Sequence, residues 1–282
     1  VGTCFSAAMF LLQEKFKVEA FALSIWCKVA CIIATLPLVF MVGLPADPRF
    51  YIWLSLQALM FAINDIIMFR AIPVVGAAVV SRLIPSTIIF SFLLWFIVDP
   101  ALLNTYLERP LLSATIFGVI VCTAYFAIRM TKCDVSMAAI KKLWFVIVAN
   151  TLGWIVAKIV IGYAPPEQGA IAFTFVEAWM MIGMWCLYLV VARPVAPATL
   201  FNKAAIKGGL IVGATMTIFV LCITSAFYQV YNPGYVSAVK MLDVVIIVMV
   251  HKMLGKADDS DKIAGFGIVA CAVVLVLLKS QI

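Results

Sequence analysis

Apolar residues come in unbroken runs of about twenty, and this feature decides what the chain can fold into. A helix needs about 20 mainly apolar residues to cross a bilayer, whereas the strands of a membrane barrel alternate polar and apolar positions. Of the 282 residues, 66% are hydrophobic and 12% are charged. In an ordinary soluble domain about 45–50% of the residues are apolar and about 25% are charged. The sequence therefore excludes a water-soluble globule and predicts an all-α membrane protein.

Ten such runs predict ten transmembrane helices joined by connections of at most about 15 residues, so no soluble domain fits. The first run is too short to cross a core of about 30 Å at about 1.5 Å per residue. Because the chain also begins at Val1 without a Met, we expect a few N-terminal residues to be missing. The runs are 1–13, 20–42, 50–69, 76–98, 111–128, 143–162, 170–192, 208–230, 235–251 and 263–278.

The chain contains an internal repeat. Ala71 to Pro85 aligns without gaps on Gln229 to Asp243, and Phe117 to Ala124 matches Phe266 to Val273. Five helices per copy is an odd number, so the second copy enters the membrane with the opposite orientation. We therefore expect two inverted five-helix repeats, 1–130 and 131–282, an architecture that places a binding site near the midplane in secondary transporters. A duplicated membrane scaffold without transport activity remains an alternative.

Several short motifs carry a family resemblance: AAVVSRLIPSTIIFSFLLWFIVD in 77–99, the Phe-Gly openings at Phe117 and Phe266, and Gly2-Thr3-Cys4-Phe5 near the start. On the basis of these motifs, the chain along essentially its whole length resembles the drug/metabolite transporter superfamily in its ten-helix EamA-type form. The acidic residue that closes the fourth helix is Asp99, where Glu is usual in that family. The resemblance implies a transporter of small organic solutes.

Ionisable residues inside the predicted spans need partners or water, because each costs about 2.5–3.5 kcal/mol at the bilayer centre. Four cations against three anions suit an anionic or zwitterionic solute, such as an amino acid or an organic acid. The seven residues are Lys28, Asp65, Arg82, Lys158, Glu177, Lys240 and Asp243.

Arg82 and Lys240 are the principal candidate substrate contacts, because they align with each other in the repeat and each follows a glycine by six residues. Their helices run in opposite directions, so the two cations are expected to bracket a central cavity. The alternative is snorkelling to the headgroups, which is favoured for Lys28 and Lys158. Asp243 is one turn from Lys240, and if the two pair, Arg82 contributes more of the recognition.

Polar or aromatic side chains in the spans expected to line the cavity complete the predicted binding site. They could hydrogen-bond or stack on a solute, or join helices and fill space. Family members that carry phosphorylated sugars or nucleotide-sugars place basic residues in their fourth and ninth helices, so that exchanger class is an alternative. The further candidates are Asn64, Asp65, Ser86, Asn150, Trp154, Ser237 and Asp243.

Enzymatic motifs are missing from the sequence, which has no catalytic triad set, no phosphate-binding loop and one histidine. We expect no enzyme activity, no cofactor and no metal. A membrane-embedded transferase using Asp65 or Glu177 is the rival class. The expected partners are a small organic solute and membrane lipid; the net charge of +7 is spread over short loops, so nucleic acid is not expected. A homodimer stays an open alternative.

Charge in the loops leaves the orientation undecided. Thirteen of the sixteen Lys and Arg residues outside the spans lie in the loops after the odd-numbered spans. The positive-inside rule places those loops in the cytoplasm and both termini outside, whereas the family resemblance implies the reverse. We expect a multi-pass protein of the bacterial inner membrane or an equivalent membrane.

Overall fold

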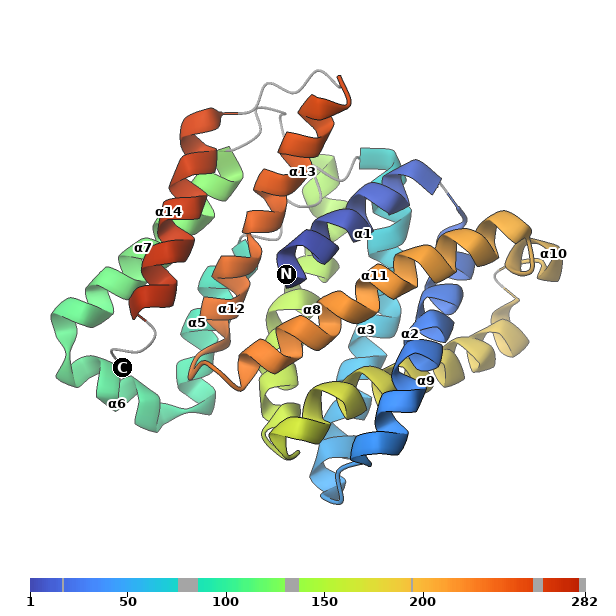
Figure 1. Cartoon of the computed structure of the whole chain (residues 1–282), viewed down its shortest axis with the longest axis horizontal. Helices are drawn as coiled ribbons and strands as arrows, with labels where there is room; N and C mark the ends of the chain where they lie inside the picture. Colours follow the sequence, from blue (N-terminus) through green and yellow to red (C-terminus); the bar gives the residue numbers. More distant parts are fainter. Residues whose placement is uncertain (17, 76–85, 130–136, 194, 256–260, 279–282) are drawn as a thin grey trace. The chain divides into compact units, whose positions relative to one another are not determined.

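The computed structural model describes residues 1–16, 18–75, 86–129, 137–193, 195–255 and 261–278. Within these ranges the chain is all-helical and contains no strand. It divides into two compact units, and the helices of each are labelled in Figure 1. Unit 1 comprises Val1–Ala77 and Val156–Tyr228, and unit 2 comprises Ala78–Ile155 and Gln229–Ile282. Each unit therefore contains segments from both predicted repeats.

Unit 1 contains the first three helices of the chain and a second group from its later half. A long helix, α8, belongs to unit 1 only in its last turns, from Val156 onward. The helices of unit 1 are α1 (Gly2–Phe16), α2 (Ala20–Val42), α3 (Pro48–Val75), the end of α8 (Met137–Ile161), α9 (Pro166–Ala192), α10 (Pro197–Leu200) and α11 (Lys203–Phe227).

Unit 2 contains the remaining helices, several of which are short. Two of them, α12 and α13, follow each other with only Met241 between them. The helices of unit 2 are α5 (Ser86–Val98), α6 (Pro100–Glu108), α7 (Pro110–Arg129), the first part of α8, α12 (Pro233–Lys240), α13 (Leu242–Met253) and α14 (Lys262–Leu278).

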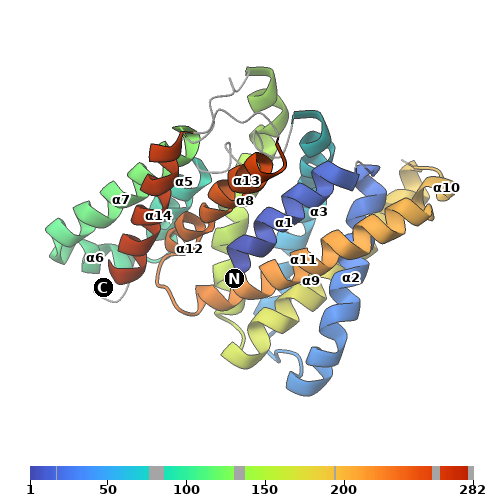
Figure 2. The ribbon, with the colours of Figure 1, turned by 45° about the horizontal axis from the view of Figure 1, so that its top comes forward.

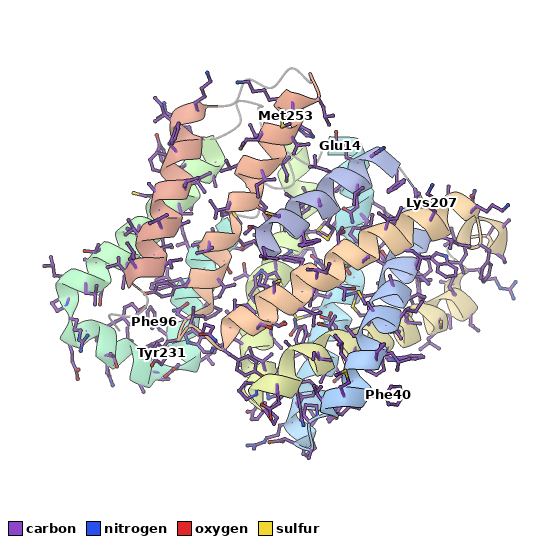
Figure 3. All side chains as sticks on the ribbon, in the orientation of Figure 1. Glu14, Phe40, Phe96, Lys207, Tyr231 and Met253 are labelled. Atoms are coloured by element: carbon purple, nitrogen blue, oxygen red, sulfur yellow. The ribbon has the colours of Figure 1, made fainter. Side chains whose placement is uncertain are left out.

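Seven helices among the described residues are long and apolar enough to cross a membrane, as a multi-pass membrane protein requires. Large apolar side chains also project outward, among them Phe40 (82% exposed) and Met253 (84% exposed), as Figure 3 shows. A water-soluble protein rarely exposes such a surface. The bent pair α5 and α6 would make an eighth span. With 15 residues in α1 and 17 in α14, the ten-helix count stays a prediction.

The connection expected between residues 99 and 110 contains a helix. Asp99 initiates α6: its Oδ1 accepts a hydrogen bond from the backbone N–H of Leu102 at 3.0 Å, and Pro100 occupies the first helical position. Both features favour a helix start. The axis turns by 106° between α5 and α6. The first residues of the predicted fourth span, 76–85, lie outside the described residues.

Helices α2 and α9 pack in antiparallel directions, side by side in Figures 1 and 2. Near the start of α2, the Phe21 ring contacts Tyr188 late in α9, with centroids 5.9 Å apart. Beyond the end of α2, a Cβ placed on Gly43 would lie 3.8 Å from Nε2 of Gln168, in the first turn of α9. The start of each helix therefore faces the end of the other.

Helices α2 and α11 approach closely at the two glycines of a GxxxG step. A Cβ placed on Gly213 would lie 2.5 Å from the carbonyl oxygen of Cys27, and one on Gly209 would lie 2.2 Å from Cβ of Trp26. Such contacts are too short for any side chain, so only glycine permits this approach. The structure thus gives both glycines a packing role.

Helices α7 and α14 of unit 2 are also antiparallel. Nε of Arg129, the last residue of α7, lies 3.0 Å from Oδ2 of Asp261, directly before α14. One to two turns further on, Gly267 of α14 packs against the Phe126 ring, where a Cβ would come within 2.5 Å. The end of α7 therefore lies at the start of α14.

Helix α12 begins at a buried asparagine that joins it to α5. Oδ1 of Asn232 accepts a hydrogen bond from the backbone N–H of Gly234 at 2.8 Å, and its Nδ2 donates to the carbonyl oxygen of Phe92 at 3.1 Å. The hydroxyl groups of Tyr106 and Tyr235 are 2.9 Å apart. Polar contacts inside an aromatic cluster thus position the start of α12.

Candidate functional site

A buried charge cluster lies where three helices of unit 1 meet. Nζ of Lys28 on α2 is 3.3 Å from Oε2 of Glu177 on α9 and 3.7 Å from Oδ2 of Asp65 on α3. The side chains of the three residues are between 3% and 6% exposed. We call Lys28, Asp65 and Glu177 the unit 1 charge cluster. It contains one cation and two carboxyl groups.

An apolar cluster on the same three helices adjoins these charges. Its buried residues lie one helical turn from the charged ones: Ile25 precedes Lys28 by three positions, Ala62 precedes Asp65 by three, and Met181 follows Glu177 by four. Residues three or four apart share a helix face. The indole N–H of Trp185 donates to the carbonyl oxygen of Ala62 at 3.0 Å and links α9 to α3. The charge cluster is therefore part of a packed interior.

The carboxyl groups of Asp65 and Glu177 differ in the hydrogen bonds that they accept. The ammonium group of Lys28 donates a hydrogen bond to Oε2 of Glu177. Asp65 accepts one from the Asn64 amide at 3.5 Å, at its Oδ1, while its buried Oδ2 has no hydrogen-bond partner among the described residues. Glu177 is thus the closer ion-pair partner of Lys28, and Asp65 is the less well compensated carboxyl group.

The expectation that Lys28 snorkels toward the headgroups is wrong, because its ammonium group is buried against two carboxyl groups. Lys158 is half-buried and donates a hydrogen bond to the backbone carbonyl oxygen of Phe227, the last residue of α11. Lys28 and Glu177 were absent from the predicted substrate contacts. Their position inside apolar spans was the signal, but sequence alone could not pair residues 149 positions apart.

The second charged group lies in unit 2, where Lys240 meets Asp243. Nζ of Lys240 is 3.2 Å from Oδ2 of Asp243, and the two side chains are 8% and 2% exposed. The sequence leaves this ion pair open as an alternative to solute binding, and the structure contains it. Ser237, one turn before Lys240, is 2% exposed, and its hydroxyl has no hydrogen-bond partner among the described residues.

The helix contains one tighter turn at this ion pair. Lys240 is the last residue of α12 and Asp243 lies in the first turn of α13, on either side of Met241. The backbone N–H of Met241 bonds to Ala238 and that of Val244 bonds to Met241, each over three residues, the tighter spacing of a 3₁₀ turn. Together α12 and α13 form one apolar stretch of 21 residues, Pro233–Met253, that is long enough to cross a membrane.

The other predicted contacts are distributed over both units. Asn150 and Trp154, one turn apart on α8 in unit 2, are 7% and 8% exposed, and the Asn150 amide donates to the carbonyl oxygen of Val146 at 2.7 Å. Asn64 and Asp65 lie in unit 1. Ser86 is the first residue of α5, and Arg82 lies outside the described residues.

Comparisons with known proteins support the fold and nothing more specific. No family model matches the chain, and no curated protein matches it. Among solved structures, 18 chains match. One of them, described only as "Crystal structure of protein", is 14% identical, has a TM-score of 0.59, and the match covers 99% of this chain and 98% of that one. The chain thus shares its fold with a solved protein along its whole length.

Proposed function

We propose that the chain is a secondary transporter that moves a small anionic or zwitterionic metabolite, such as an amino acid or an organic acid. It works by alternating access, with no cofactor, in the bacterial inner membrane or an equivalent membrane. Arg82 and Lys240 are its principal substrate contacts. The class corresponds to the EamA-type drug/metabolite transporters that the sequence resembles.

The buried ammonium group of Lys240, at the tight turn between α12 and α13, is the observation that supports this proposal most. A lysine there is costly unless a carboxylate or a solute compensates it. Its present partner, Asp243, lies one turn away, and the buried hydroxyl group of Ser237, one turn before Lys240, has no hydrogen-bond partner among the described residues. An anionic solute group would bind Lys240 by competing with Asp243.

Packing within each of the two units supports the inverted repeat. At the sequence offset of 158, Leu54 and Phe69 of α3 correspond to Val212 and Phe227 of α11, and all four are at most 1% exposed. The pairs α2 with α9 and α7 with α14, which are equivalent helices in the two copies, run antiparallel. Equivalent helices of opposite orientation are what a two-repeat transporter requires.

Reconstitution into proteoliposomes tests the function. The purified protein is first screened by thermal stabilisation against amino acids, dicarboxylic acids, sugar phosphates and nucleosides, because only bound solutes raise its stability. Uptake of the solute that stabilises most is then measured in sealed vesicles. Lys240→Ala and Arg82→Ala should abolish uptake while the protein still purifies as a folded species. Lys207→Ala, at an exposed position on α11, should transport like the parent protein.

Three outcomes would favour the alternatives. Normal uptake by both Lys240→Ala and Arg82→Ala would contradict the substrate contacts. Stabilisation and exchange only with sugar phosphates or nucleotide-sugars would assign the exchanger class instead. Turnover of a solute in detergent, without a sealed vesicle, would indicate a membrane-embedded transferase, and no transport of any solute would indicate a scaffold.

A further inference from the structure

The unit 1 charge cluster is not neutral if all its groups are ionised. One ammonium group, on Lys28, faces two carboxyl groups, on Asp65 and Glu177, and all three are buried. No other cationic side chain forms an ion pair with either carboxyl group in the described part of the chain. An unpaired buried charge costs several kcal/mol. Binding one more positive charge beside Lys28 would make the buried cluster neutral and is therefore favoured.

We propose that this additional charge is a proton, and that the unit 1 charge cluster is the proton-coupling site of the transporter. The inference rests on the proposed transport function, because coupling has meaning only for a protein that moves a solute. In the conformation described, Lys28 and Glu177 form the ion pair, and Asp65 is the neutral carboxylic acid.

Asp65 is assigned the proton because its negative charge would be the less stabilised of the two. Its Oδ2 is 3.7 Å from the ammonium group, beyond hydrogen-bond distance, and has no hydrogen-bond partner among the described residues, whereas Glu177 receives a hydrogen bond at 3.3 Å. The buried oxygen thus lacks the donors that an ionised carboxylate needs.

A metal ion fits this cluster poorly. Sodium and other hard cations bind several oxygen atoms, and here an ammonium group occupies the space next to both carboxyl groups. No group of three or more His, Cys, Asp and Glu side chains that could hold a metal is found in the described ranges. A proton needs only one oxygen.

The remaining titratable groups near the site do not supply the missing positive charge. Cys27 and Cys31 on α2 lie next to Lys28 and are buried. From α11, Gly213 and Thr217 face this part of α2 and do not titrate. From α3 and α9, the charged groups that face Lys28 are Asp65 and Glu177 themselves.

Proton release links the site to alternating access. When the other conformation admits water to Asp65, its carboxylic acid transfers the proton to water, and the resulting carboxylate competes with Glu177 for Lys28. Rebinding of a proton on the opposite side restores the neutral acid. Lys28 contacts helices α3 and α9 through these two groups, so protonation changes which helix it holds more strongly.

Infrared titration of the purified protein in detergent tests the bound proton without any solute. The parent protein should show the carbonyl stretch of a buried carboxylic acid at neutral pH, shifted in deuterated buffer. Asp65→Asn and Glu177→Gln should each lose that band, because either change leaves one acid paired with Lys28. Lys28→Met should double it. Glu108→Gln, at an exposed position on α6, should leave it unchanged.

A band that is absent from the parent protein, or that persists in Asp65→Asn, would overturn the proposal. A second arm uses proteoliposomes: an imposed pH gradient should drive uptake of the stabilising solute, and Asp65→Asn should reduce gradient-driven uptake to the level without a gradient while retaining solute counterflow. If Asp65→Asn still takes up the solute when a pH gradient is imposed, the proton on Asp65 has only a structural role. That result would overturn the proposal that the unit 1 charge cluster couples transport to protons. Absence of uptake by the parent protein would instead contradict the transport function, and the infrared result would still stand.

Discussion

The ammonium group of Lys28 and the carboxylate of Glu177, 149 positions apart in the sequence, lie 3.3 Å apart between α2 and α9. Asp65 joins them from α3 at 3.7 Å. Because α2 and α9 belong to different predicted repeats, this contact joins segments from both halves of the chain inside one compact unit. The ion pair is therefore a structural link as well as a candidate site.

Lys28→Met should destabilise the protein strongly. The substitution keeps the volume of the side chain but leaves the buried carboxylate of Glu177 without its cation, and removing one partner of a buried ion pair costs about 3–5 kcal/mol. The free energy of unfolding in detergent, followed by tryptophan fluorescence, measures the effect. Lys207, which projects from the start of α11 (Figure 3), provides the control, and Lys207→Met should change stability by about 0.5 kcal/mol or less.

If Lys28→Met lowers the free energy of unfolding no more than Lys207→Met does, the charge of Lys28 contributes little to stability. The double change Lys28→Met with Glu177→Gln should recover part of the loss, because it removes one stranded carboxyl group together with its partner. Recovery above the additive value would measure the coupling between the two residues.

Gly213→Ala should separate α2 from α11. The added Cβ would lie 2.5 Å from the Cys27 carbonyl oxygen and 2.7 Å from Cβ of Ala30, so a helix must shift, which typically costs about 1–3 kcal/mol. Gly183 on α9 is the matched control, since a Cβ there meets nothing within 4 Å. Gly183→Ala should be neutral or stabilise by up to about 1 kcal/mol. Equal melting temperatures of the two variants would disprove the close approach.

Hydropathy alone predicted the seven helices among the described residues that are long and apolar enough to cross a membrane, because burial in lipid requires long apolar runs. It could not predict α6, whose helix depends on the cap at Asp99 and on Pro100. It also could not predict the tight turn at Met241, because Val, Leu and Met continue the apolar pattern on both sides of it. Local backbone geometry at such points leaves no trace in mean hydropathy.

The sequence could predict which charged residues lie in the membrane spans, but not which of them pair across helices. Ionisable residues in apolar runs identified Lys28, Asp65 and Glu177 as costly, and Lys240 with Asp243 were one turn apart, so their pairing was foreseeable. The contact of Lys28 with Glu177 depends on how α2 packs on α9. That packing is set by shape complementarity between distant segments, which one sequence does not reveal.

Asn232→Ala should destabilise the protein by more than an ordinary helix cap does. The buried side chain caps α12 at Gly234 and also donates a hydrogen bond to the carbonyl oxygen of Phe92, so its loss removes a second buried hydrogen bond, worth about 0.5–1.5 kcal/mol, in addition to about 1 kcal/mol for the cap. Asn202 is an exposed cap that bonds only to Ala204 in the same way, and Asn202→Ala should cost about 1 kcal/mol. Thermal unfolding in detergent compares the stabilities of the two variants. Equal losses of stability would mean that the hydrogen bond from Asn232 to Phe92 contributes nothing.

Asp243→Asn should tighten the binding of an anionic solute. The change preserves shape but removes the carboxylate that lies 3.2 Å from the Lys240 ammonium group, so a solute anion no longer displaces a charged competitor. We expect roughly tenfold tighter binding, about 1.4 kcal/mol, of the anionic solute that stabilises the parent protein most. Transport is expected to slow, because a solute held more strongly in one conformation leaves it less readily.

Isothermal titration of the purified variant in detergent measures this affinity directly. Asp261→Asn is the matched control in the same unit, since Asp261 pairs with Arg129 at a more exposed position, where an ion pair contributes about 0–1 kcal/mol. That variant should bind the solute like the parent protein. Weaker binding by Asp243→Asn would mean that Asp243 receives a donor group of the solute, so that the substrate enters this site with its amine rather than with its carboxylate.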